Sequence, residues 1–160
     1  QASRRNVEMS LDYGWVYRRY YTRTPQTTAL DLSKLMETLQ QRKDEYGLGC
    51  EIWLDSLGYT ERVFCELHGA KEHWARCPKS NVLLFDPTFG TNRHGLKLCC
   101  FVSISATGRN TILAFVLIEV ENKETFEWSF RCFAKAFRTP PRVFGTDGDK
   151  EIEKAVDLLT

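Results

Sequence analysis

Residues 81–92 read NVLLFDPTFGTN, and they contain the strand around which we expect the rest of the chain to be arranged. Four apolar residues, 82–85, lead directly into Asp86, and turn-forming residues follow. An apolar run of this length between turn signals predicts a strand buried on both faces. An ionised carboxylate at the end of such a strand needs a hydrogen bond, an ion pair or a metal ion to offset its desolvation. Asp86 is therefore the first candidate for a functional residue.

Composition predicts one main folded unit, because 42% of the 160 residues are hydrophobic, enough for a sizeable core. Lys and Arg number 22 and Asp and Glu 21, so a formal charge of +1 gives no global attraction to nucleic acid. We find no apolar run of membrane-spanning length and no signal peptide, and we expect a soluble, intracellular protein with no membrane partner. The chain starts with Gln1 and stops inside a predicted helix, so we also expect it to be a fragment of something longer.

The cysteines are expected to be free thiols, since no secretory signal accompanies them. There are six of them, Cys50, Cys65, Cys77, Cys99, Cys100 and Cys132. The pairs Cys65-x-x-His68 and His73-x-x-x-Cys77 also have the residue types and spacing of a zinc site. Because isolated Cys and His usually just pack in a mixed core, zinc is the less favoured interpretation of these four residues.

The chain before residue 81 divides into two parts. Residues 1–28 have no regular spacing of apolar residues, which predicts a linker or a partial helix. Within them, residues 17–23 (YRRYYTR) have two interpretations: they could contact phosphates and bases, or they could form a solvated helix face. In residues 29–80, apolar residues at helical spacing predict an amphipathic helix over 29–43. Two strands at 50–55 and 61–67 predict a hairpin, and a short helix over 69–77 leads into the core.

Residues 81–160 predict an α/β arrangement of three strands, a helix, a fourth strand and a last helix. The strands are expected at 81–86, 97–105, 111–120 and 142–147. Asn122 is expected to cap the first helix, which carries one stripe of Phe126, Phe130, Phe133 and Phe137. Because a helical crossover returns the chain in the same direction, the fourth strand should be parallel to the first.

Parallel and adjacent strands would bring Asp86 and Asp147 to the same carboxyl edge of the sheet, where α/β proteins place their functional crevice. Two carboxylates that meet there repel each other unless a cation is shared between them, and hard oxygen ligands suit Mg²⁺ or Mn²⁺. The matching chemistry is two-metal phosphoryl transfer. The alternative from the residues alone is that Asp86 begins a turn and Asp147 caps the helix after it.

Three blocks resemble the catalytic domain of Mutator-like element (MULE) transposases. The blocks are residues 85–92 (FDPTFGTN), with Pro87 and Phe89 where the family usually has Thr and Tyr, residues 122–128 (NKETFEW), and residues 146–149 (TDGD). They occur in the family's order, and the likeness spans about residues 45–160.

This resemblance implies a partial ribonuclease H-like fold over residues 81–160 that cuts and joins DNA with an Asp-Asp-Glu triad and a divalent metal. Asp86 matches the first acid and Asp147 the second. The family places the third acid far downstream, so we expect an incomplete site and a missing C-terminal half of the domain. Transposon-end DNA would be the partner, in the nucleus, with a possible homo-oligomer. The same family includes transposase-derived plant transcription regulators that lack catalysis, which is the alternative function.

Basic residues near the first acid, Arg93 and Lys97, together with Arg142 before the fourth strand, are candidates for contacts with DNA phosphates. The other interpretation of these residues is ordinary surface charge.

Overall fold

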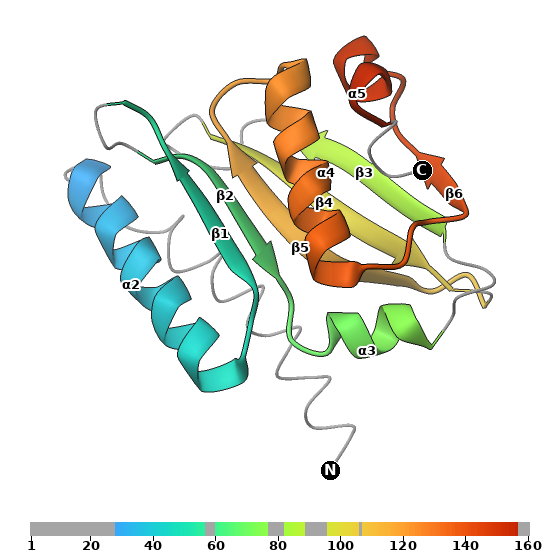
Figure 1. Ribbon diagram of the computed structural model, residues 1–160, viewed down its shortest axis with the longest axis horizontal. Helices are drawn as coiled ribbons and strands as arrows, with labels where there is room; N and C mark the ends of the chain where they lie inside the picture. The colour runs from blue at the N-terminus through green and yellow to red at the C-terminus, as the bar shows by residue number, and fades with distance from the viewer. Residues whose placement is uncertain (1–27, 57–59, 77–81, 89–95, 106, 157–160) are drawn as a thin grey trace.

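The computed structural model describes residues 28–56, 60–76, 82–88, 96–105 and 107–156. These residues form a mixed α/β structure built on one six-stranded sheet (Figure 1). The strands are β1 (Cys50–Leu54), β2 (Thr60–Glu66), β3 (Val82–Thr88), β4 (Lys97–Ile104), β5 (Asn110–Ile118) and β6 (Val143–Gly145). The helices are α2 (Thr28–Tyr46), α3 (Ala70–Ala75), α4 (Lys123–Phe137) and α5 (Lys150–Ala155). None of the helices in these ranges has the length and apolar content needed to cross a bilayer.

The strand order is β1-β2-β5-β4-β3-β6, and every neighbouring pair is antiparallel except β3 and β6, which are parallel. The predicted order of three strands, a helix, a parallel fourth strand and a helix is therefore confirmed. The predicted hairpin is also confirmed, because β1 and β2 pair antiparallel. It extends the same sheet at the β5 side, so the segments on either side of residue 81 share one sheet, whereas the proposed domain boundaries remain a prediction.

Helix α4 crosses the front of the sheet in Figure 1 and forms the main core with it. It begins where Asn122 accepts a hydrogen bond from the Thr125 backbone N–H, as predicted, and it ends at Arg138, whose φ is 60°. All four phenylalanines of its predicted stripe are buried, Phe126, Phe130, Phe133 and Phe137. Phe133 stacks on Phe101 of β4 at a centroid distance of 4.6 Å. An aromatic layer thus fixes the helix on one face of the sheet.

The opposite face of the sheet is covered less evenly. A second apolar cluster forms where Leu39 of α2 packs against Val63, Cys65 and Phe115. Helix α2 lies beside β1 at one end of the sheet, while β6 and α5 lie at the other end (Figure 1). On this face the side chains of β3 and β4, such as Leu84 and Cys100, are half-buried rather than fully buried.

Strand β3 differs from its prediction in burial and in length. Leu83 and Phe85 are buried under α4, but Val82 and Leu84 on the other face are half-buried and Asp86 is exposed. The prediction of a strand buried on both faces was wrong, because α4 covers only one face there.

The strand also continues past Asp86, since Pro87 and Thr88 still pair with β4. Strand β6 pairs only with residues 82–84, so along the described chain β3 has no second neighbour at Pro87. Proline has no backbone N–H, and it is tolerated in a strand where that side makes no hydrogen bond to another strand.

Truncation of Phe101 should be among the most damaging changes to this core. Phe101 is fully buried and contacts Phe85, Phe130 and Phe133. We expect Phe101→Ala to lower the free energy of unfolding by about 3–5 kcal/mol, measured by urea denaturation. Leu54→Ala, at a side chain 50% exposed, should cost less than about 1 kcal/mol. Equal costs for the two variants would contradict this description of the core.

Candidate functional site

Asp86 lies on β3, and Asp147 follows β6, the strand that pairs with β3 in parallel. The paired residues of β3 and β6 are Val82 with Val143, Leu83 with Phe144, and Leu84 with Gly145. Each pair is separated by 61 positions (143 − 82), and so are the two aspartates (147 − 86). Strand β6 ends at Gly145, so Asp147 lies in the loop between β6 and α5 rather than on the strand. The predicted parallel, adjacent pairing of these strands is confirmed.

The carboxylate of Asp86 is exposed on the face of the sheet opposite to α4. Asp86 pairs with Cys100 on β4, and Cys100 pairs in turn with Phe115 on β5. Within the part of the chain that the structure describes, Asp86 makes no hydrogen bond or ion pair. Because the Asp86 side chain is exposed, the cost of full desolvation that its sequence context implied does not arise.

Asp147 is exposed as well, and its own loop orients it. Its Oδ1 accepts hydrogen bonds from the Thr146 hydroxyl and from the Asp149 backbone N–H, each at 3.1 Å. Asp149 in turn caps α5, because its Oδ1 accepts from the backbone N–H groups of Glu151 and Ile152. The capping role considered for Asp147 thus belongs to Asp149, while Asp147 is held just outside the helix.

Two exposed carboxylates at one edge are a suitable donor set for a hydrated Mg²⁺ or Mn²⁺ ion, which prefers oxygen ligands and keeps several waters. Asp86 and Asp147 are the residues that would hold it. Among the described residues, no group of three or more His, Cys, Asp or Glu side chains could hold a metal ion. A complete ligand set would therefore need a further oxygen donor, from outside these residues or from a bound phosphate.

Gly145 of β6 lies against a side chain of the neighbouring strand, β3. A Cβ built at Gly145 would lie 2.6 Å from Cδ2 of Leu84, its paired residue on β3. The prediction from sequence did not single out this glycine, although a glycine inside a strand is a known signal of close backbone or side-chain approach. Gly145 thus leaves room for the Leu84 side chain in its present position.

A methyl group at Gly145 should strain this contact. We expect Gly145→Ala to lower the free energy of unfolding by up to about 1 kcal/mol, because the end of the half-buried Leu84 side chain has to rotate away. The same change made in a Leu84→Ala background should cost clearly less, since the clashing methyl is gone. Urea denaturation of the four proteins of this double-mutant cycle measures the coupling. Strictly additive effects would show that Leu84 and Gly145 do not limit the approach of the strands.

The two described basic candidates, Lys97 and Arg142, lie at different edges of the sheet. Lys97 lies at the same edge, because β4 is antiparallel to β3, but its amino group is paired with Glu121. Arg142 precedes β6, so it lies at the opposite edge of the sheet from Asp86. The contact of Arg142 with DNA phosphates stays a prediction. Arg93 lies outside the described residues.

Three of the four residues considered for a zinc site are described, and each has different surroundings. Cys65 is buried and contacts Cys50, and the ring of His68 packs edge-on against Tyr46 at 5.7 Å. His73 is half-buried on α3, and Cys77 lies outside the described residues. Zinc binding by this set remains the less favoured prediction.

Comparison with protein families identifies the segment that carries both aspartates. Residues 82–159 match the MULE transposase domain. This match confirms the resemblance seen in the three sequence blocks. It begins with β3, and it includes α4, which contains most of the second block, and the loop between β6 and α5, which contains the third. The described part of the MULE segment is thus the β3-β4-β5-α4-β6-α5 unit.

A curated relative covers more of the chain. Protein FAR1-RELATED SEQUENCE 2 from Arabidopsis thaliana is 29% identical over 128 residues, which is 79% of this chain but only 16% of the relative. The chain therefore spans about a sixth of the length of that relative. No solved structure matches the chain significantly. Together, the two sequence comparisons support a transposase-derived protein.

Proposed function

We propose that this chain supplies the first two carboxylates, Asp86 and Asp147, of a divalent-metal-dependent site for DNA strand cleavage and joining. The observation that carries the proposal is the parallel register of β3 and β6, which directs both acids to one edge of the sheet. The match of residues 82–159 to the MULE transposase domain supports DNA as the substrate. The order of β3 to β6 supports a ribonuclease H-like fold, in which three antiparallel strands are followed by a parallel fourth strand beside the first.

The contribution of the chain itself is to position two oxygen donors. Asp86 presents a solvated carboxylate, and the Thr146 hydroxyl and Asp149 N–H fix the orientation of Asp147. A bound Mg²⁺ or Mn²⁺ would supply activation of the attacking oxygen and stabilisation of the leaving oxygen. Full activity also needs the third acid that the family resemblance implies, so we propose that this segment works within a larger assembly, in the nucleus.

A second function is favoured by the named relative. FAR1-RELATED SEQUENCE 2 supports the alternative that the chain comes from a transposase-derived, DNA-associated regulator without catalysis. In that case the fold serves as a scaffold, and neither Asp86 nor Asp147 is needed for its activity. The two proposals differ in whether the aspartates bind a divalent cation.

Titration with Mg²⁺ or Mn²⁺ separates the two functions. We expect the wild-type chain to bind Mg²⁺ weakly, with a Kd on the order of 10⁻³ M, because only two carboxylates contribute. Asp86→Asn and Asp147→Asn should each weaken binding by at least about tenfold, since each removes one charged ligand. Isothermal calorimetry, or Mg²⁺-dependent shifts of the backbone amides near both residues, measures the effect.

Glu153→Gln is a matched control, because it removes one exposed carboxylate from α5 without touching either aspartate. It should leave Mg²⁺ binding unchanged. If all three variants bind Mg²⁺ like the wild type, or if the wild type gives no response, the metal-dependent function is contradicted and the scaffold function is favoured.

A further inference from the structure

Cys50 and Cys65 lie directly opposite each other on the antiparallel strands β1 and β2. The Glu66 backbone N–H donates to the carbonyl of Gly49 at 2.9 Å, so the two cysteines form a non-hydrogen-bonded pair of the ladder. In such pairs the Cα atoms are only about 4.5 Å apart, within the roughly 4.4–6.8 Å range that a disulfide requires. The backbone at this position is therefore already compatible with a covalent link.

The two sulfur atoms are in contact. Cys65 Sγ donates a hydrogen bond to Cys50 Sγ at 3.2 Å, and both residues are free thiols. An S–S bond is about 2.05 Å long, so the atoms need to approach by little more than 1 Å. Small side-chain rotations can supply that movement without a change in strand register.

The surroundings make the two thiols unequal. The hydrogen bond from Cys65 lowers the pKa of Cys50, and the positive charge of Lys43 adds to this effect against the opposing cost of burial. The same hydrogen bond and burial raise the pKa of Cys65 well above its ordinary value. Cys50 is therefore the better nucleophile of the pair, and Cys65 remains protonated beside it.

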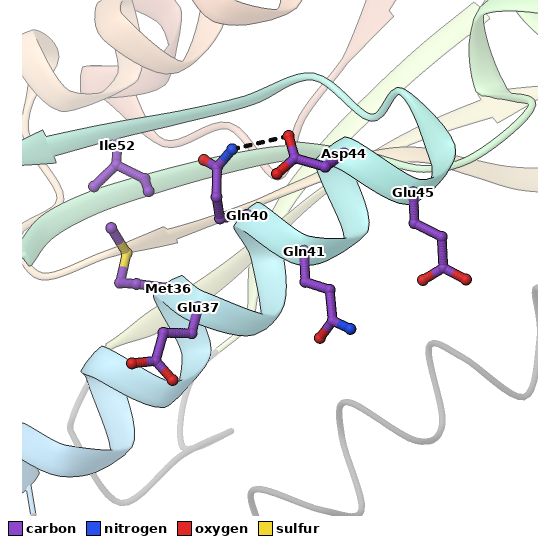
Figure 2. A pocket seen from close by; sticks show the side chains of 7 residues that line it. All are labelled: Met36, Glu37, Gln40, Gln41, Asp44, Glu45 and Ile52. Carbon is purple, nitrogen blue, oxygen red and sulfur yellow. Dashed lines mark hydrogen bonds between the residues drawn. The ribbon is translucent and has the colours of Figure 1, made fainter.

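A small oxidant has access to Cys50 but little to Cys65. Cys50 is half-buried, whereas Cys65 is only 3% exposed under α2. An open groove of about 860 Å³ runs between α2 and β1 and is lined by Met36, Gln40, Asp44 and Ile52, among others. Figure 2 shows Ile52 of β1 facing Met36 of α2 across it, and Ile52 shares a strand face with Cys50.

We propose that Cys50 and Cys65 form an oxidisable dithiol that hydrogen peroxide converts into an intramolecular disulfide. The Cys50 thiolate attacks one peroxide oxygen, so an S–O bond forms and the O–O bond breaks. The hydroxide that leaves takes up the proton that the Cys50 thiol gave up and becomes water. The Cys65 sulfur then attacks the Cys50 sulfur, the S–O bond breaks, and the departing hydroxide takes up the Cys65 proton as water. The two thiols lose two electrons in total, and one peroxide becomes two waters.

The disulfide would tie β1 to β2 at the far end of the sheet from the metal-binding aspartates. One row of paired residues crosses the strands, from Cys50 through Cys65, Phe115 and Cys100 to Asp86. Four strand spacings of about 4.8 Å, roughly 19 Å in all, separate Cys50 from Asp86. Oxidation therefore proceeds whether or not the chain binds a metal ion.

Peroxide treatment followed by thiol mapping tests this proposal on the wild-type chain. After brief exposure to H₂O₂ and alkylation of the remaining thiols, digestion and mass spectrometry should recover a Cys50–Cys65 disulfide peptide, which a dithiol reductant removes. The link closes a loop between residues 15 positions apart, so the oxidised chain should melt about 5–10 °C higher than the reduced chain.

Two variants locate the chemistry. Cys65→Ser should leave a Cys50 sulfenic acid that reacts with dimedone, because no second thiol can resolve it. Cys132→Ser is the matched control and should still form the disulfide, since burial raises the pKa of Cys132 to about 12 and keeps its thiol protonated. The proposal is wrong if Cys50 and Cys65 stay reduced while other cysteines oxidise, or if disulfides form only between chains.

Discussion

The packing of the α4 aromatic stripe against one face of the sheet is the constraint on which the rest of this structure depends. Phe130 contacts both Phe85 of β3 and Phe144 of β6, at centroid distances of 5.1 and 5.4 Å. A helix anchored over these strands returns the chain beside β3 in the parallel direction. That return places β6, and the loop after it that contains Asp147, next to β3. The aromatic core and the candidate site are thus consequences of the same crossover.

One-sided packing also explains the chemistry of the opposite face. Because α4 buries only the Leu83 and Phe85 side of β3, Asp86 remains in water and can exchange solvent for a metal ion at little cost. At the other end of the same row, α2 covers Cys65 and leaves Cys50 partly accessible. The face that the aromatic helix does not cover therefore carries one candidate metal ligand, Asp86, and the candidate redox pair.

Most of the element order was predictable, because the signals were local: the Phe126–Phe137 spacing, the Asn122 cap and the alternation in β4. The parallel pairing of β3 and β6 also followed from the rule for helical crossovers. The exposure of Asp86 was not predictable, since it depends on which face α4 covers. The close approach at Gly145 and the contact of Cys50 with Cys65 were missed because each depends on strand register, which hydrophobic pattern alone does not specify.

Paramagnetic mapping with Mn²⁺ would test the central claim, that Asp86 and Asp147 share one cation at one edge of the sheet. In ¹⁵N-labelled protein, substoichiometric Mn²⁺ should broaden the backbone amides of Thr88 and Gly148 together, because both are neighbours of the two carboxylates. Asp147→Asn should reduce the broadening at Thr88 as well as at Gly148. Broadening that is confined to one of the two segments, or that gathers at the acidic residues of α2 instead, would contradict a shared site.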